Sequence, residues 1–169
     1  CDGLGDCLPA CPVDAISFVE REAAPYDEAA VKKAKEDKAT HMVVPGRLEQ
    51  WPVQIKLLPV NAPFYNGADI LIAADCTAYA YGNFHNEFIR GRITLVGCPK
   101  LDSIDYSEKL TQIFANNNVT SVTVARMTVP CCGGIEFAVR KAIENSGKAI
   151  ACSVITISPE GEIVDKRTF

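Results

Sequence analysis

Cysteines follow three predicted strands in the second half of this 169-residue sequence. Apolar runs lead to Cys76 in ADILIAADC, to Cys98 in RITLVGC, and to the vicinal pair Cys131 and Cys132 in VARMTVPCC. The carboxyl ends of neighbouring parallel strands form the crevice in which open α/β sheets bind ligands. We therefore expect thiols from three strands to meet there, as in a metal centre, an iron–sulfur site or a dithiol redox centre.

The residues after these cysteines favour thiolates. Thr77 and Gly133 stand where helices are expected to begin, and the positive end of a helix stabilises an anion. Gly133 and Gly134 allow backbone N–H groups to approach sulfur closely, and Pro99 fixes the direction of its loop. The local sequence is thus compatible with anionic sulfur at each strand end.

Cys76, Cys98, Cys131 and Cys132 together form a predicted four-thiolate set, which is enough for zinc or a four-iron cluster. One of the vicinal pair can stand outside such a compact site. Alternatively, each of these cysteines is buried in the core and packs there as a small hydrophobic residue. His85, in a predicted helix after Cys76, is either a further ligand or proton carrier, or a hydrogen-bonded helix residue.

The composition excludes several classes of protein. Hydrophobic residues make up 48% of the chain and the formal net charge is −4, which indicates a globular protein without a basic surface for nucleic acid. No apolar run is long enough to span a bilayer, and no signal peptide is recognisable. We therefore expect a cytoplasmic protein without membrane insertion. Eight cysteines in such a chain favour metal ligation over disulfides.

A second group of cysteines stands at the start of the chain. Cys1, Cys7 and Cys11, the last followed by Pro12, have the spacing of a bacterial ferredoxin run, C-x2-C-x2-C-x3-C-P, with Leu4 in the second cysteine position. Three thiolates remain where a cubane cluster needs four. A zinc knuckle is the weaker alternative, because no histidine lies nearby. Since the motif begins at the first residue, we expect a fragment whose upstream portion is absent.

The remaining sequence indicates three segments and an α/β fold. Residues 1–20 form the partial ferredoxin-like unit, 21–50 a polar linker with an exposed helix capped by Asp27, and 51–169 an α/β domain. In this domain we expect strands at 53–60, 69–75, 93–97, 121–129 and 151–158, and helices at 78–90, 105–116 and 133–146. Their alternation predicts a largely parallel, doubly wound sheet.

Several segments in combination resemble one known family. CDGLGDCLPACPVDAI, WPVQ, NAPF, ADILIAADC, NFH, GCPKLD and VPCCGG are similar to segments of ferredoxin-type iron–sulfur proteins of anaerobic bacteria and archaea. Such proteins join two N-terminal ferredoxin motifs to a C-terminal Rossmann-like α/β domain, and the first motif is missing here. The resemblance implies that Cys1 and Cys7 face one [4Fe–4S] cluster, that Cys11 faces another, and that these clusters carry single electrons.

We therefore interpret the chain as an iron–sulfur protein of anaerobic electron transfer that works with a redox partner protein, with oligomerisation left open. The resemblance gives no role for the strand-end cysteines, which we assign to a second metal or iron–sulfur centre. Two alternatives remain. The domain is an oxidoreductase that acts on a small substrate through a cluster or the Cys131–Cys132 dithiol, or it is a zinc-stabilised domain that docks other subunits.

Overall fold

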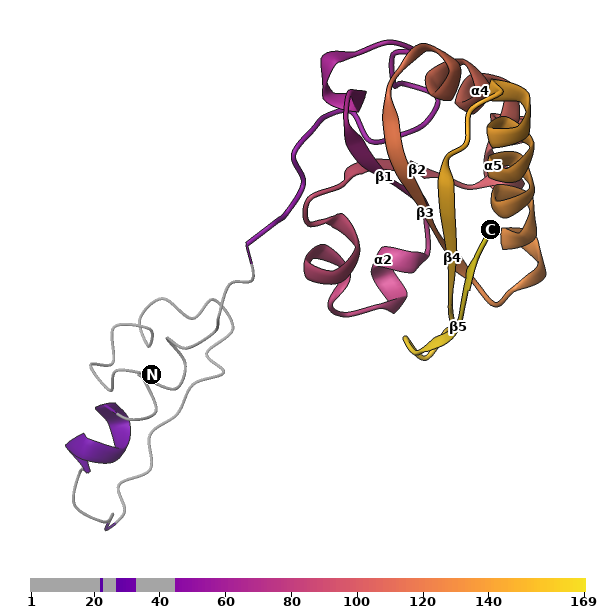
Figure 1. Ribbon diagram of the computed structural model, residues 1–169. Coiled ribbons are helices and arrows are strands. Elements are labelled where there is room, and N and C mark those ends of the chain that lie inside the picture. The colour runs from indigo at the N-terminus through magenta and orange to yellow at the C-terminus, as the bar shows by residue number, and fades with distance from the viewer. Residues whose placement is uncertain (1–21, 23–26, 33–44) are drawn as a thin grey trace, which may run out of the picture. The chain divides into compact units, whose positions relative to one another are not determined.

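The computed structural model describes residue 22 and residues 27–32 and 45–169 (Figure 1). The chain divides into two units, Cys1–Val44 and Pro45–Phe169. In the first unit, residues 28–32 are helical, and Asp27 Oδ1 accepts a hydrogen bond from the Ala30 N–H at 2.9 Å. This contact confirms Asp27 as a cap. The expected ferredoxin-like segment, with Cys1, Cys7 and Cys11, lies outside the described residues.

A five-stranded sheet in the order β2-β1-β3-β4-β5 forms the centre of the second unit. Its strands are β1 (Ala68–Ala74), β2 (Ile93–Gly97), β3 (Val119–Met127), β4 (Ala151–Ile157) and β5 (Ile163–Thr168). The first four are parallel to one another, whereas β5 returns antiparallel along β4. The predicted α/β class and largely parallel sheet are confirmed, while β5 was not expected.

Helices connect the successive parallel strands. η1 (Pro63–Tyr65) precedes β1, and α2 (Thr77–Ala80) and η2 (His85–Ile89) connect β1 to β2. The second connection contains α3 (Pro99–Asp102) and α4 (Tyr106–Asn116), and the third contains η3 (Pro130–Cys132) and α5 (Gly133–Ser146). In the described ranges, no helix has the length and apolar character needed to cross a membrane.

These helices cover the two faces of the sheet unequally (Figure 1). On one face α4 and α5 pack against each other, and the Tyr106 side chain lies so close to Gly97 that a Cβ atom there would be 2.6 Å from its hydroxyl oxygen. On the opposite face lie α2 and η2, which belong to the first crossover. On that opposite face α2 contacts β3, but Ser121 and Thr123 of β3 and Ser153 of β4 remain partly exposed; we call this side of the sheet the open face.

The strand sequences differ according to whether helices pack on one face of the strand or on both. β1 lies beneath helices on both faces, and residues 70–74 are all buried. On β3 and β4, by contrast, Ser121, Thr123 and Ser153 are partly exposed on the open face, while Val122 and Val154 are buried on the helix side. A strand buried on both faces reads as a continuous apolar run, whereas one solvated face gives alternation.

Two predicted elements were wrong. Residues 53–60 form no strand, because only Gln54 pairs with β2, opposite Val96, before the chain turns at Leu57. The expected helix 78–90 is divided into α2 and the wider π-turn of η2, with Gly82 in the break between them. Its aromatic face is nevertheless present, since the rings of Phe84 and Phe88 stack at 4.8 Å.

A buried carboxylate fixes the orientation of α5 on the sheet. Glu136, in the first turn of α5, accepts hydrogen bonds from Arg126 of β3 at 2.7 Å, from Arg140 of its own helix at 3.2 Å, and from Arg167 of β5 at 3.2 Å. Burial raises the pKa of Glu136, but the hydrogen bonds from Arg126 and Arg140 outweigh it, so the pKa lies below its ordinary value of 4.5.

We predict that Glu136→Gln lowers the free energy of unfolding by about 2 kcal/mol at pH 7, because three guanidinium groups lose a buried anion. The pKa of Glu136 is lower in the folded state than its ordinary value of 4.5. The stabilisation is therefore complete above about pH 4.5 and is lost as the pH falls through the pKa of the folded state. Urea unfolding at pH 7 and pH 3.5 measures both effects. Glu144→Gln, at an exposed position on the same helix, is the control. Equal stability of the two variants at pH 7 would contradict this account.

Candidate functional site

The four strand-end cysteines lie at the carboxyl edge of the sheet. Cys98 comes directly after β2, Cys76 follows β1 with Asp75 between them, and Cys131 and Cys132 lie in η3 after β3. The chain runs from β1 to β2 on one side and from β3 to β4 on the other. The strand order therefore reverses between β1 and β3, which is where open α/β sheets bind ligands. Cysteines stand on both sides of that point.

Three of these cysteines occupy the same position relative to a helix. Cys76, Cys98 and Cys132 are the residues that directly precede α2, α3 and α5, and no side-chain capping hydrogen bond occupies their sulfur atoms. Thr77 is the first residue of α2, as expected, and donates its hydroxyl hydrogen to the Ala74 carbonyl at 2.7 Å. The sulfur atoms are thus placed at helix starts without serving as caps.

Three thiols at this edge influence one another. Cys131 and Cys132 are adjacent in η3, and Cys76 lies near enough for its charge to act on Cys132. Burial raises the pKa of Cys132, and the charges of Cys131 and Cys76 raise it further, although the backbone of Met127 lowers it. Cys132 is 5% exposed, whereas Cys76 and Cys131 are exposed. One protected thiol therefore lies beside two accessible ones.

The fourth cysteine reaches this group through the packing of α3. Contacts join α3 to η3 and to α5, so the loop after β2 extends across the end of β1 to the cysteines after β3. At the contact, a Cβ atom on Gly134 would lie 3.2 Å from both Cβ and Cγ of Pro99. Glycine at this position therefore permits the close approach of Pro99, and with it of partly buried Cys98.

The described side chains do not form a preassembled metal-ligand group. Among residues 22, 27–32 and 45–169, no three His, Cys, Asp or Glu side chains are gathered closely enough to hold a metal ion. The four cysteines share an edge and soft donor atoms, which suit zinc and iron–sulfur clusters. Binding such a group at this edge requires the thiols to turn toward one another.

A pair of carboxylates lies at the same edge. Burial raises the pKa of Asp75, and the charge of Asp102 raises it further, while a hydrogen bond with Gln54 lowers it. Asp75 Oδ1 is buried and has no hydrogen-bond partner within the described part of the chain. Asp102 accepts a hydrogen bond from the Tyr106 hydroxyl group, and Lys56 Nζ is 4.0 Å from its Oδ1. The crevice thus combines thiols with a carboxyl group that is poorly solvated.

His85 lies on the open-face side of the sheet, in η2. Its Nδ1 accepts a hydrogen bond from the backbone N–H of Arg47 at 3.1 Å, and the neighbouring Asn86 accepts one from Arg47 Nε at 3.1 Å. His85 also lines an apolar cavity of about 200 Å³ together with Trp51 and Phe84. These contacts hold the segment before β1 in place, which corresponds to the alternative of a hydrogen-bonded helix residue.

Cys152 stands apart from the strand-end group. It is fully buried in β4, and burial raises its pKa to about 12. A thiol of that kind stays protonated and packs as a small hydrophobic residue.

Sequence reasoning missed two residues at the carboxyl edge. Gln54 and Asp102 both act on Asp75, but each was placed in a segment without an assigned role. The signal for Asp102 was its position four residues after Cys98, close to the end of β2. The role of Gln54 could not be inferred in this way, because it depends on an isolated bridge to β2.

Comparisons with known proteins agree with this fold. Residues 62–169 match the family described as Rossmann-like domain. An uncharacterized protein of the archaeon Archaeoglobus fulgidus is 36% identical over 102 residues, which make up 60% of this chain and 71% of that relative. No solved structure matches the chain significantly. The family match lies within the α/β domain.

We predict that Gly134→Ala separates α3 from α5, because its methyl group would meet Pro99 at 3.2 Å. Gly133→Ala is the matched control, because it adds the same methyl group at the neighbouring position, where no other atom lies within 4 Å of the added carbon. We expect the first variant to be less stable than the second by about 1 kcal/mol, and Cys98 to react faster with iodoacetamide. Equal stability and equal Cys98 reactivity in the two variants would contradict the proposed packing.

Proposed function

The chain belongs to the Rossmann-like domain family, and on that premise we propose that it is an iron–sulfur protein of anaerobic electron transfer. In this proposal Cys76, Cys98, Cys131 and Cys132 bind a metal or iron–sulfur centre at the carboxyl edge of the α/β domain. One observation supports it: cysteines follow three strands at the carboxyl edge of the sheet, the edge at which the strand order reverses between β1 and β3. Packing requirements do not account for that coincidence, because two of these cysteines are exposed.

The four cysteine sulfur atoms are suitable ligands for zinc or an iron–sulfur cluster. Thiolate sulfur is the preferred ligand of iron–sulfur clusters and a common ligand of zinc. Helix starts follow three of the cysteines and would offset part of the negative charge that four thiolates bring. A [4Fe–4S] cluster, when bound, would supply transfer of single electrons. The exposed Cys76 and Cys131 are free to reorient, whereas buried Cys132 provides a fixed point.

The N-terminal motif supports the same function. The spacing of Cys1, Cys7 and Cys11 before Pro12 resembles half of a two-cluster ferredoxin. We propose that this segment contributes ligands to [4Fe–4S] clusters, and that these clusters and the centre of the α/β domain exchange electrons with a redox partner protein.

A second candidate function rests on the vicinal thiols. Exposed Cys131 and buried Cys132 are adjacent in η3, and the charge of Cys76 acts on Cys132. Oxidation of two of these thiols to a disulfide would release two electrons and two protons to an acceptor such as another disulfide. The domain would then be a thiol–disulfide oxidoreductase without a metal. In that exchange one thiolate attacks the acceptor disulfide to form a mixed disulfide, which the second thiol then attacks to close the protein disulfide. Burial and the raised pKa of Cys132 favour it as the second of these thiols and exposed Cys131 as the first.

Metal analysis separates these functions. The chain is purified without oxygen as a variant in which Cys1, Cys7 and Cys11 are replaced by serine, so that only the α/β domain supplies thiolates. We predict that this variant retains iron and acid-labile sulfide in equal amounts, about four of each per chain. Adding Cys98→Ala should remove at least half of both, while Cys152→Ala, at a buried position away from the edge, should leave them unchanged.

Three outcomes would contradict the iron–sulfur proposal. Zinc without iron would indicate a structural zinc site. Equal loss of iron in the Cys98→Ala and Cys152→Ala variants would indicate general destabilisation rather than ligation. A chain without metal that undergoes reversible two-electron oxidation, abolished by Cys131→Ser, would instead support the dithiol function.

A further inference from the structure

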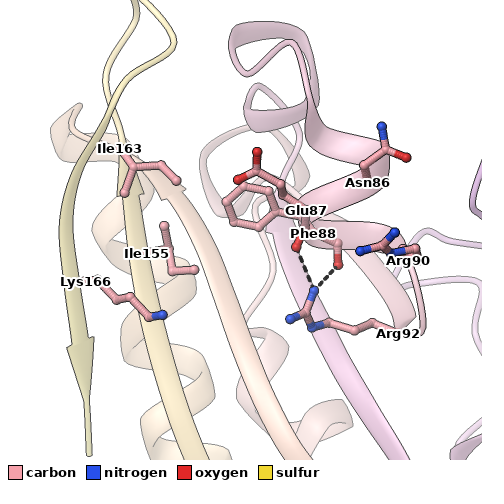
Figure 2. A pocket seen from close by; sticks show the side chains of 8 residues that line it. All are labelled: Asn86, Glu87, Phe88, Arg90, Arg92, Ile155, Ile163 and Lys166. Atoms are coloured by element: carbon pink, nitrogen blue, oxygen red, sulfur yellow. Dashed lines mark hydrogen bonds between the residues drawn. The ribbon is translucent and has the colours of Figure 1, made fainter. Parts of the chain in front are cut away.

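A recess on the open face of the sheet carries features that the cysteine site does not use. Its volume is about 310 Å³, and it lies between η2 and the start of β2 on one side and β4 and β5 on the other (Figure 2). None of the strand-end cysteines lines it. The volume is at the lower end of the range for small-molecule sites, which is about 300–1,000 Å³.

The floor of the recess is apolar and rigid on one side. Phe88 of η2 is only 2% exposed, and its ring is held by stacking on Phe84 and by an edge contact with Tyr81 at 5.3 Å. Ile155 and Ile163 of β4 and β5 face it from the other wall (Figure 2). Ile163 is 43% exposed, so part of this apolar surface is in contact with water. A ligand with an apolar body would remove that contact.

Three cationic side chains surround this floor. Arg90 follows η2, Arg92 precedes β2 and Lys166 lies on β5, and none forms an ion pair within the part of the chain that the structure describes. Arg92 Nη1 donates hydrogen bonds to the carbonyl oxygens of Glu87 and Phe88 at 2.9 and 2.7 Å (Figure 2). This fixes the guanidinium group and leaves its other N–H donors available.

The one acidic residue of the recess does not cancel these charges. Glu87 is bound by the Tyr81 hydroxyl group at 2.6 Å and by Asn83 Nδ2 at 2.7 Å. The hydrogen bond from Tyr81, followed by that from Asn83, lowers the pKa of Glu87, so it remains an anion with its oxygens already engaged. Three cations and one anion leave an excess of two positive charges in a chain whose net charge is −4.

We propose that this recess binds a small organic carboxylate with an apolar body. The body would lie on Ile155 and Ile163, beside the buried ring of Phe88, and the carboxylate would meet the guanidinium group of Arg92, whose planar geometry matches two carboxylate oxygens. Arg90 and Lys166 would add attraction from the rim. An inorganic anion would leave the apolar floor in water, and a neutral ligand would leave the cations unused. The inference is independent of the function proposed for the cysteines.

The test uses benzoate as the probe and the full 169-residue chain, observed by ¹H–¹⁵N and methyl NMR. We predict saturable shifts at Phe88, Ile155 and Ile163 with a dissociation constant of about 1 mM. The double variant Arg90→Gln/Lys166→Gln should weaken binding about tenfold, because two cations are lost. Lys100→Gln, an exposed lysine of α3 outside the recess, should change it less than twofold. Addition of 0.5 M NaCl should also weaken binding.

Benzyl alcohol and inorganic phosphate complete the experiment. If benzyl alcohol binds as tightly as benzoate, the cations play no part and the proposal fails. If inorganic phosphate shifts the same signals with equal affinity, the apolar floor plays no part and the proposal fails as well. Absence of saturable shifts, or equal binding by the double variant and the wild-type chain, would also overturn it. Selective weakening in the double variant, with an unchanged spectrum elsewhere, would support it.

Discussion

The parallel pairing of β1 with both β2 and β3 is the constraint on which the rest of the structure depends. Because the strands are parallel and β1 lies between the other two, their carboxyl ends reach the same edge. The cysteines that follow them are thereby placed along one edge, although Cys76 and Cys132 are 56 residues apart in the sequence. Close packing also acts at this edge, since Gly134 allows Pro99 to bring the loop of Cys98 against the start of α5.

The same connectivity explains the uneven cover of the sheet. The first crossover places α2 and η2 on one face, and the later crossovers place α4 and α5 on the other (Figure 1). The first face is therefore covered only in part over β3 and β4, where partly exposed serine and threonine alternate with buried valine. Where this open face meets η2, cations and apolar side chains form the recess for which we propose a carboxylate ligand.

Much of the fold could be predicted because the strongest signals were local. The apolar run before Cys76 and the helix ended by Gly147, which adopts a left-handed φ of 68°, are specified by their own residues. The segment 53–60 could not be predicted, because its apolar residues pack as turns along the edge of β2 rather than as a strand. At the site, the shared edge followed from strand order, but the contacts of Asp75, Gln54 and Asp102 depend on tertiary packing that no local pattern records.

The central claim is that cysteines from three strands serve one centre, and cysteine-resolved alkylation tests it most directly. The chain is treated without oxygen with increasing iron and sulfide, alkylated, and analysed by mass spectrometry at each loading. The account predicts that Cys76, Cys98 and at least one of Cys131 and Cys132 lose reactivity together, at a single loading, while Cys152 is unreactive throughout because it is fully buried. Protection confined to Cys1, Cys7 and Cys11, with the strand-end thiols as reactive as before, would contradict it.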